Sequence, residues 1–182
     1  MIREIVVYGD PVLNAKGAEI KRVDAALRTL AADMLETMYD ANGVGLAAHQ
    51  VGVPVQLCVL DVRGVEDRPS TMEIDGRAVP FEEHMPLVLL NPQLRLDPER
   101  ETGIEGCLSF PDITADISRA VRVWVDAVDL EGRKVQFAAT GLLSRAAQHE
   151  VDHLNGVLFV ARMNSATRAV LAGKLRRLRG GA

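Results

Sequence analysis

The sequence predicts a single α+β domain in which antiparallel or mixed β-sheets pack around a central helix, with a further helix at the C-terminal end. The 182 residues suffice for one domain with a hydrophobic core and are too few for two comfortable domains. A composition of 48% hydrophobic and 25% charged residues is ordinary for globular proteins and argues against a disordered chain. Strand patterns come mostly before the second predicted helix and do not alternate with helices, which favours the α+β class.

The first half of the chain is predicted to form one helix and two buried strands. Apolar residues that recur every three or four positions predict the helix over residues 24–41, and Asn42-Gly43 ends it. The strands are short apolar runs at 55–62 and 87–90. We expect the second strand to end at Asn91-Pro92, because proline interrupts the hydrogen bonds of a sheet.

The middle of the chain is predicted to contain a long loop and a hairpin. Residues 63–86 are polar and include three prolines, so we expect them to form a surface loop. Residues 121–127 alternate between apolar and polar side chains, which predicts a half-exposed strand. A turn at Glu131-Gly132-Arg133 then leads to its hairpin partner around residues 135–137.

Two helices are predicted in the last quarter of the chain. The first begins after Gly141 and ends at Asn155-Gly156, and the second covers residues 165–178, where Gly173 weakens it. Charge is unevenly distributed: all 25 acidic residues precede His153, whereas the chain from there onward carries six of the 21 basic ones. The basic helix and tail, residues 165–182, could bind a polyanion or simply form a solvated helix face.

The first of these two helices carries His149-Glu150-Val151-Asp152-His153. Two histidines four residues apart lie on one face of a helix and can hold a metal ion, with the glutamate between them as general base. On a helical wheel His149, Glu150 and His153 fall at or within the apolar sector. The other polar residues fall on the opposite arc: Ser144, Arg145, Gln148, Asp152 and Asn155. Because buried ionisable groups need partners, this pattern predicts a metal site.

A third metal ligand has to come from upstream, because no His, Cys, Asp or Glu follows His153. The candidates are Cys107, Cys58, His49, His84 and various carboxylates. Cys58 lies in an apolar strand, where a small buried thiol is the usual case. Cys107 follows a glycine in a segment that can present its sulfur to a site. From the residues alone, Cys107 is as consistent with a free buried thiol as with a ligand.

Three segments of the chain resemble, in order and without substitution, the three motifs of the peptide deformylases. They are Gly43-Val44-Gly45-Leu46-Ala47-Ala48-His49-Gln50, Glu105-Gly106-Cys107-Leu108-Ser109 and Gln148-His149-Glu150-Val151-Asp152-His153-Leu154-Asn155-Gly156. The similarity extends over nearly the whole chain. It implies that Cys107, His149 and His153 are the metal ligands, with a fourth position left for water, and that Glu150 is the acid/base.

The resemblance also implies roles for five further residues. Gln50 would donate its side-chain amide to the developing oxyanion, helped by the backbone N–H of Leu108. Gly45 would lie along the substrate backbone. Glu105 would pair with Arg119 and hold the Cys107 loop.

The activity implied is removal of the N-formyl group from the starting methionine of new bacterial polypeptides, giving formate. The family usually uses Fe²⁺, while Zn²⁺, Ni²⁺ or Co²⁺ can occupy its site. One alternative is a metallopeptidase of other specificity with the same HExxH motif, which the missing downstream ligand disfavours. A second alternative is a structural metal site on an RNA-binding chain, which Glu150 disfavours because structural sites are closed.

The resemblance and the sequence also suggest where the protein acts. Some deformylases dock on the ribosome through a C-terminal helix, so the basic tail is a candidate for that contact. We expect a cytoplasmic protein with no membrane partner, because the N-terminus has no signal pattern and the apolar runs are short. The chain departs from the family pattern at Asp112, where many members have glycine, and in the length of segment 63–86.

Overall fold

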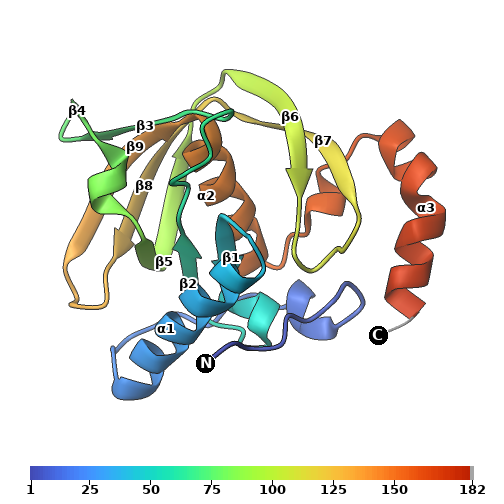
Figure 1. The fold of residues 1–182 in the computed structure, drawn as a ribbon, viewed down its shortest axis with the longest axis horizontal. Coiled ribbons are helices and arrows are strands. Elements are labelled where there is room, and N and C mark those ends of the chain that lie inside the picture. The colour runs from blue at the N-terminus through green and yellow to red at the C-terminus, as the bar shows by residue number, and fades with distance from the viewer. Residues whose placement is uncertain (181–182) are drawn as a thin grey trace.

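One helix lies at the centre of the molecule, with β-sheets on two of its sides (Figure 1). The computed structural model describes residues 1–180, so the last two residues of the predicted tail lie outside the described residues. Its α-helices are α1 (Ala25–Asp40), the central α2 (Gly141–Leu154) and α3 (Ser165–Gly180). The predicted α+β class, with a motif-bearing central helix and a C-terminal helix, is confirmed.

The strands form two antiparallel sheets. The larger sheet has the order β1 (Gly45–Ala47), β2 (Leu57–Leu60), β5 (Leu87–Leu96), β8 (Arg122–Val128), β9 (Lys134–Thr140), β3 (Ser70–Ile74) and β4 (Arg77–Val79). The smaller is a two-stranded ribbon of β6 (Arg100–Gly106) and β7 (Thr114–Ala120), which we call the β6–β7 ribbon. In Figure 1 the larger sheet lies on one side of α2 and the ribbon on the other.

Helix α1 forms where its periodicity predicts. Asp24 caps it by accepting a hydrogen bond from the Leu27 N–H at 2.9 Å. Its buried face, which includes Met34 and Met38, packs against β1 and β2. Asn42 follows in the left-handed region (φ 53°), as expected for a residue that ends a helix.

Segment 63–86 is not a plain surface loop, contrary to the prediction. It contains the hairpin β3–β4 and a short 3₁₀ helix, Phe81–His84. β3 pairs with β9, and Met72 fills the core opposite Ala139. The hairpin lies at the sheet edge, so most of its side chains are polar and its strands carry a weak hydrophobic signal. Asp75-Gly76, with positive φ at both residues, is the turn signal that could have revealed it.

Two further strand predictions were incomplete. β5 does not end at Asn91-Pro92 but continues to Leu96, with a register shift at that point and Asn91 in the left-handed region (φ 50°). The β6–β7 ribbon was not predicted at all. In β7 the buried positions alternate, but one of them is Arg119, which breaks the apolar pattern that a sequence reading relies on.

Helix α2 is buried on almost every side, including most of the polar arc that lies opposite the apolar sector on the helical wheel. Ser144, Arg145 and Gln148 are all buried beneath the β6–β7 ribbon. The Gln148 carboxamide bonds the backbone of Ala120, accepting from its N–H at 3.0 Å and donating to its carbonyl at 2.9 Å. Of the five polar residues on that arc, only Asn155 is exposed.

The start of α2 is capped by the first residue of β3 and the residue before it. The Leu143 N–H donates to Ser70 Oγ at 3.0 Å, and the Leu142 N–H donates to the Pro69 carbonyl at 3.3 Å. Gly141 has φ 65°, and a Cβ there would lie 2.0 Å from the Pro69 oxygen, so this close approach requires glycine. The first turn of the motif helix therefore depends on residues about 70 positions earlier.

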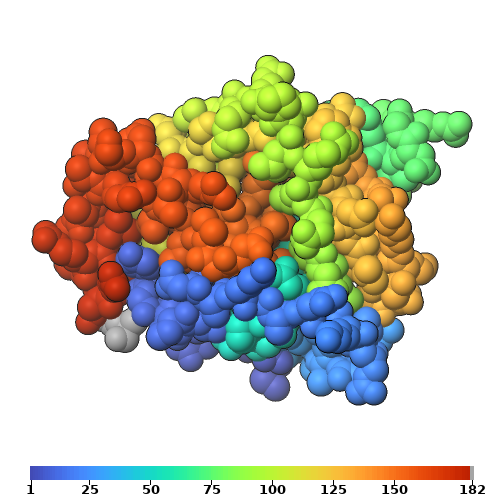
Figure 2. All heavy atoms as spheres, turned by 180° about the vertical axis from the view of Figure 1, so that it is seen from behind, coloured from blue at the N-terminus to red at the C-terminus, as the bar shows by residue number. Residues whose placement is uncertain are grey.

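Helix α3 packs at one end of the molecule through three leucines. Leu171, Leu175 and Leu178 contact a cluster around Phe110 and Phe159. Figure 2 shows the rear face, where the N-terminal segment runs below the chain that follows α2. No helix among the described residues is long and apolar enough to cross a bilayer.

Candidate active site

A cleft of about 550 Å³ opens between β1, the β6–β7 ribbon and α2. Its walls combine the three sequence motifs with residues from elsewhere in the chain. The lining residues are Asn42, Gly43, Val44, Gly45, Gln50, Arg68, Glu105, Gly106, Cys107, Leu108, Phe110, Pro111, Asp112, Ile113, Thr114, Leu142, Arg145, Ala146, His149 and Glu150. A cleft of this size and mixed character is typical of a small-ligand site.

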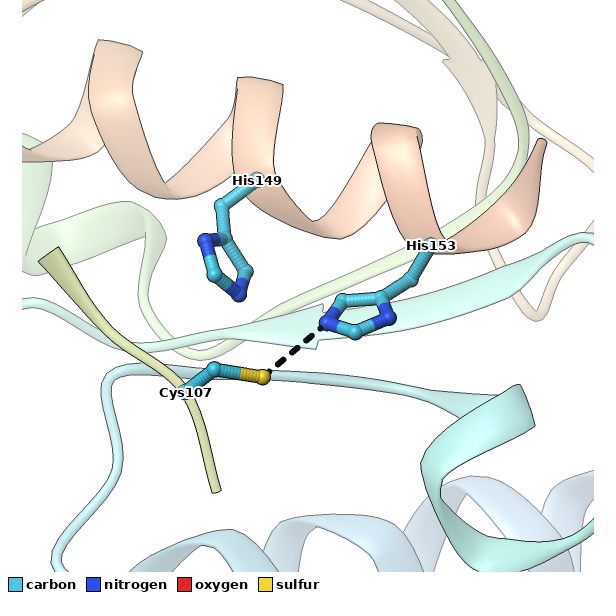
Figure 3. Close-up of side chains that lie close together, drawn as sticks. All are labelled: Cys107, His149 and His153. Atoms are coloured by element: carbon cyan, nitrogen blue, oxygen red, sulfur yellow. Dashed lines mark hydrogen bonds between the residues drawn. The ribbon is translucent and has the colours of Figure 1, made fainter. Parts of the chain in front are cut away.

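Cys107, His149 and His153 come together beside this cleft. One potential ligand atom from each lies within 4.8 Å of the others, and Cys107 Sγ is 3.3 Å from His153 Nε2. Figure 3 shows both imidazoles pointing from α2 toward the cysteine. A thiolate with two imidazoles suits Fe²⁺, Zn²⁺ and similar divalent ions, so the residues fit a metal of this kind.

The other candidates for the third ligand lie outside this group. Cys58 is fully buried in β2, as expected for a core thiol, and burial raises the pKa of its sulfur. His84 is exposed and lines a different cavity. His49 is fully buried, and neither of its ring nitrogens has a hydrogen-bond partner among the described residues.

Glu105 organises the side of the site formed by the ribbon. Its carboxylate accepts two hydrogen bonds from Arg119, at 2.8 and 2.9 Å, and one from Arg145 at 3.0 Å. Glu105 Oε2 also lies 2.9 Å from His149 Nδ1, which leaves His149 Nε2 free to bind a metal. Burial alone would raise the pKa of Glu105, but the bonds from Arg119 and His149 outweigh it and hold the pKa well below its ordinary value.

Glu150 has the opposite environment. It is 4% exposed, and its Oε2 has no hydrogen-bond partner within residues 1–180. Burial raises the pKa of Glu150 to about 7. Its Oε1 lies against Gly45, where a Cβ would approach to 2.5 Å, so glycine at position 45 leaves room for this carboxylate.

Gln50 and Leu108 both lie next to Cys107, one in space and the other in the sequence. Gln50 lies in the 3₁₀ helix Ala48–Val51, and its Oε1 accepts from the Ala47 N–H at 2.9 Å. This bond turns the Gln50 Nε2 toward Cys107 Sγ, at 3.6 Å, and Ser109 Oγ, at 3.3 Å. Within the described part of the chain, no hydrogen bond uses the Leu108 N–H.

The structure therefore gathers all nine residues with predicted roles in one region, and it adds several that the sequence analysis missed. Arg145, one turn before His149, bonds Glu105 from inside the helix. Asp152, between the motif histidines, binds Arg119 from the other side. Arg68 reaches the cleft rim from segment 63–86. The spacing of Arg145, one helical turn before His149, could have placed it at the site. Its charge instead suggested a position away from the buried side of the helix.

Asp112 occupies a special backbone position at the edge of the cleft. It has φ 59°, in the left-handed region where glycine is favoured. Asp tolerates this region better than most residues, so the departure from the family pattern is sterically compatible with the same loop.

Comparisons with known proteins show which family the chain is similar to. The family model for polypeptide deformylase matches residues 2–169. A peptide deformylase of Opitutus terrae is 47% identical, covering 98% of this chain and 93% of that protein, and one of Methylacidiphilum infernorum is 45% identical, covering 100% and 95%. The crystal structure of the Thermotoga maritima peptide deformylase superposes with a TM-score of 0.77 at 36% identity, covering 90% of this chain and 99% of that one. The Synechococcus elongatus enzyme, solved with actinonin, gives 0.80 at 39% identity, covering 94% and 87%. With its motifs gathered in one cleft, the chain belongs to the polypeptide deformylase family.

Proposed function

We propose that this chain hydrolyses the N-formyl group from the N-terminal formyl-methionine of newly made polypeptides, releasing formate and the Met-peptide. The observation that carries this is the buried carboxylate of Glu150, whose Oε2 has no partner among residues 1–180, together with the Cys107–His149–His153 group beside an open cleft. Family membership supports the activity and does not favour the alternative of a metallopeptidase with other specificity. We also propose that residues 1–182 act as one catalytic domain.

Each site residue has a distinct part in this reaction. Glu150 accepts a proton from the attacking water and delivers it to the leaving amine. Its pKa of about 7 suits it to both proton transfers. The Gln50 amide and the Leu108 N–H donate to the formyl oxygen as it gains charge. Gly45 lies along the substrate backbone.

Cys107, His149 and His153 would hold one divalent metal ion. When bound, such an ion lowers the pKa of a water molecule and polarises the formyl carbonyl. We propose Fe²⁺ as the ion used in the cell, with Zn²⁺, Ni²⁺ or Co²⁺ able to replace it. Metal analysis of anaerobically purified protein tests this. The iron form should lose activity in air while the zinc form persists, because Zn²⁺ has no accessible oxidation step beside the thiolate.

The activity is tested with matched peptides. Formyl-Met-Ala-Ser should release formate, whereas acetyl-Met-Ala-Ser should be a much poorer substrate and internal peptide bonds should stay intact. Actinonin, the ligand in the Synechococcus elongatus structure, should compete with the formyl peptide. Cleavage of internal bonds without formate release would instead establish the metallopeptidase alternative.

We propose that α3 is the contact with the ribosome, and that the protein acts in the cytoplasm where polypeptides are made. The basic side chains of α3 are exposed and form no ion pair within the described residues: Arg168, Lys174, Arg176, Arg177 and Arg179. Exposed cations of this kind bind RNA phosphate in a salt-dependent way.

The ribosome contact is best tested by substitution, because deleting the tail would also remove Leu175 from the core. Replacing Lys174, Arg176, Arg177 and Arg179 together by Gln should abolish co-sedimentation with ribosomes at low salt and leave turnover of a short formyl peptide unchanged. Arg133→Gln, at an exposed position on the β8–β9 turn, is the matched control. Ribosome binding that survives the fourfold substitution would refute the contact.

A further inference from the structure

The side chain of Arg145 ties α2 to both strands of the β6–β7 ribbon. It is 5% exposed and lies one helical turn before His149. Its Nη1 donates to the Ile117 carbonyl of β7 at 2.8 Å, and its Nη2 donates to the Glu101 carbonyl of β6 at 3.3 Å. Nη1 also donates to Glu105 Oε1 at 3.0 Å. One guanidinium therefore fixes the ribbon, the helix and the Glu105 carboxylate relative to each other.

The ribbon leaves a space for this guanidinium at Gly103. A Cβ on Gly103 would lie 3.0 Å from Arg145 Nη2 and 3.2 Å from its Cζ, closer than nearly all ordinary contacts. A side chain at this position would require the guanidinium to shift by a few tenths of an ångström, and the backbone of Gly103 is not in the left-handed region. Gly103 and Arg145 therefore form a pair: because Gly103 has no side chain, the Arg145 guanidinium can lie close to β6.

The contact reaches the metal group through Glu105. Oε1 of Glu105 accepts from both Arg119 and Arg145, while Oε2 accepts from Arg119 and lies 2.9 Å from His149 Nδ1. Glu105 is also two residues before Cys107, so its position bears on two of the three potential ligands. Without Arg145, Oε1 would keep a single cation, and among the described residues the Glu105 side chain would be linked to α2 through His149 alone.

We propose that Arg145 is a positioning residue of the metal centre, which acts through Glu105 on His149 and Cys107, and that Gly103 is the position that makes room for it. This inference rests on the proposed metal-dependent function. The contacts of Arg145 with backbone carbonyls hold its guanidinium in place independently of Glu105, so the carboxylate meets a cation that is already fixed.

The test uses metal affinity, measured by competition with a chelator, and the visible spectrum of the Co²⁺-loaded protein. Arg145→Met keeps a long side chain but removes the charge and every hydrogen bond. It should weaken Co²⁺ affinity about 10- to 100-fold, as is typical when a partner of a metal-bound histidine is lost. It should also alter the thiolate-to-cobalt absorption. Arg145→Lys, which restores the charge, should recover part of the affinity.

Arg100→Met is the matched control. Arg100 also links the two strands of the ribbon, donating to Ser118 Oγ at 3.1 Å and to the Ser118 carbonyl at 2.7 Å, but it is exposed and has no contact with Glu105. Loss of this link should leave Co²⁺ affinity and spectrum unchanged. Equal losses in Arg100→Met and Arg145→Met would show that only ribbon stability matters and would overturn the positioning role.

Gly103→Ala completes the test and is informative even where Arg145→Met folds poorly. In the wild-type background it should displace the guanidinium and lower Co²⁺ affinity, whereas in the Arg145→Met background it should add little. Additive losses would overturn the pairing, and a wild-type affinity in Arg145→Met would overturn the inference itself. Because affinity and spectrum need no substrate, a wild type that binds Co²⁺ but releases no formate would contradict the proposed function alone.

Discussion

Two glutamates line the same cleft, and their surroundings are opposite in kind. Glu105 and Glu150 are almost equally buried, at 5% and 4% exposed. Glu105 is surrounded by Arg119, Arg145 and His149, and its pKa is held low. Glu150 has an oxygen with no partner among the described residues, and its pKa is raised to about 7. Burial alone therefore does not distinguish a structural carboxylate from a reactive one, whereas the number of donors around it does.

The largest expected effect comes from neutralising the glutamate without donors. Glu150→Gln should lower kcat for a formyl peptide by about 10²- to 10⁴-fold, because an amide cannot take the water proton. Metal content should stay unchanged, since the three potential ligands are untouched. Formate release and metal analysis on the same preparation check both statements. A variant that keeps a tenth of the wild-type kcat would show that Glu150 is not the general base.

The same substitution at the other glutamate should lower the stability of the protein even when no metal is bound. Glu105→Gln leaves the buried guanidinium groups of Arg119 and Arg145 without their shared anion. Loss of one partner in a buried ion pair costs about 3–5 kcal/mol of unfolding free energy. Urea unfolding of the metal-free protein measures this, with Glu150→Gln as the comparison, which should be no less stable than the wild type at pH 8. If the two variants were equally stable, the contrast between the glutamates would be lost.

The two cysteines sharpen the contrast between a site residue and a core residue. Cys107→Ser should weaken metal binding, because a neutral hydroxyl is a poor ligand beside two imidazoles. Cys58→Ser should leave metal binding intact and lower the unfolding free energy by about 1–3 kcal/mol, because it buries a hydroxyl among apolar side chains. Chelator competition and urea unfolding distinguish these outcomes, and reversed effects would contradict the ligand assignment.

The smallest effect is the pH dependence of stability, which should have opposite signs for the two glutamates. The pKa of Glu105 is lowered from 4.5, so its contribution is present above that pH and is lost as the pH falls. The pKa of Glu150 is raised from 4.5 to about 7, so the folded state loses stability as the pH rises between those values. Urea unfolding of metal-free wild type, Glu105→Gln and Glu150→Gln, measured from well below pH 4.5 to above pH 7, should show that each variant loses one of the two slopes. Parallel curves for all three proteins would contradict the assignment.

The sequence predicted those features that depend on residues close together in the chain. The spacing of His149, Glu150 and His153 on an apolar helix face predicted a metal site, and Asn42-Gly43 predicted the end of α1. Prediction failed where contacts join distant segments. The charge of Arg119 and Arg145 disguised buried positions, because their partners on other elements are invisible in a linear pattern. The hairpin at 70–79 failed for a related reason, since its edge strands bury few side chains.

The capping of α2 by Pro69 and Ser70 has a consequence for how the protein folds. A helix of 14 residues is marginal in water by itself, and this one obtains caps for its first turn only when a distant segment has docked. An isolated peptide of residues 141–156 should therefore be largely unstructured, and its two histidines should bind metal weakly. During folding, the pair becomes aligned only after β3 has joined β9. Acquisition of the metal should accordingly follow assembly of the sheet and not nucleate it.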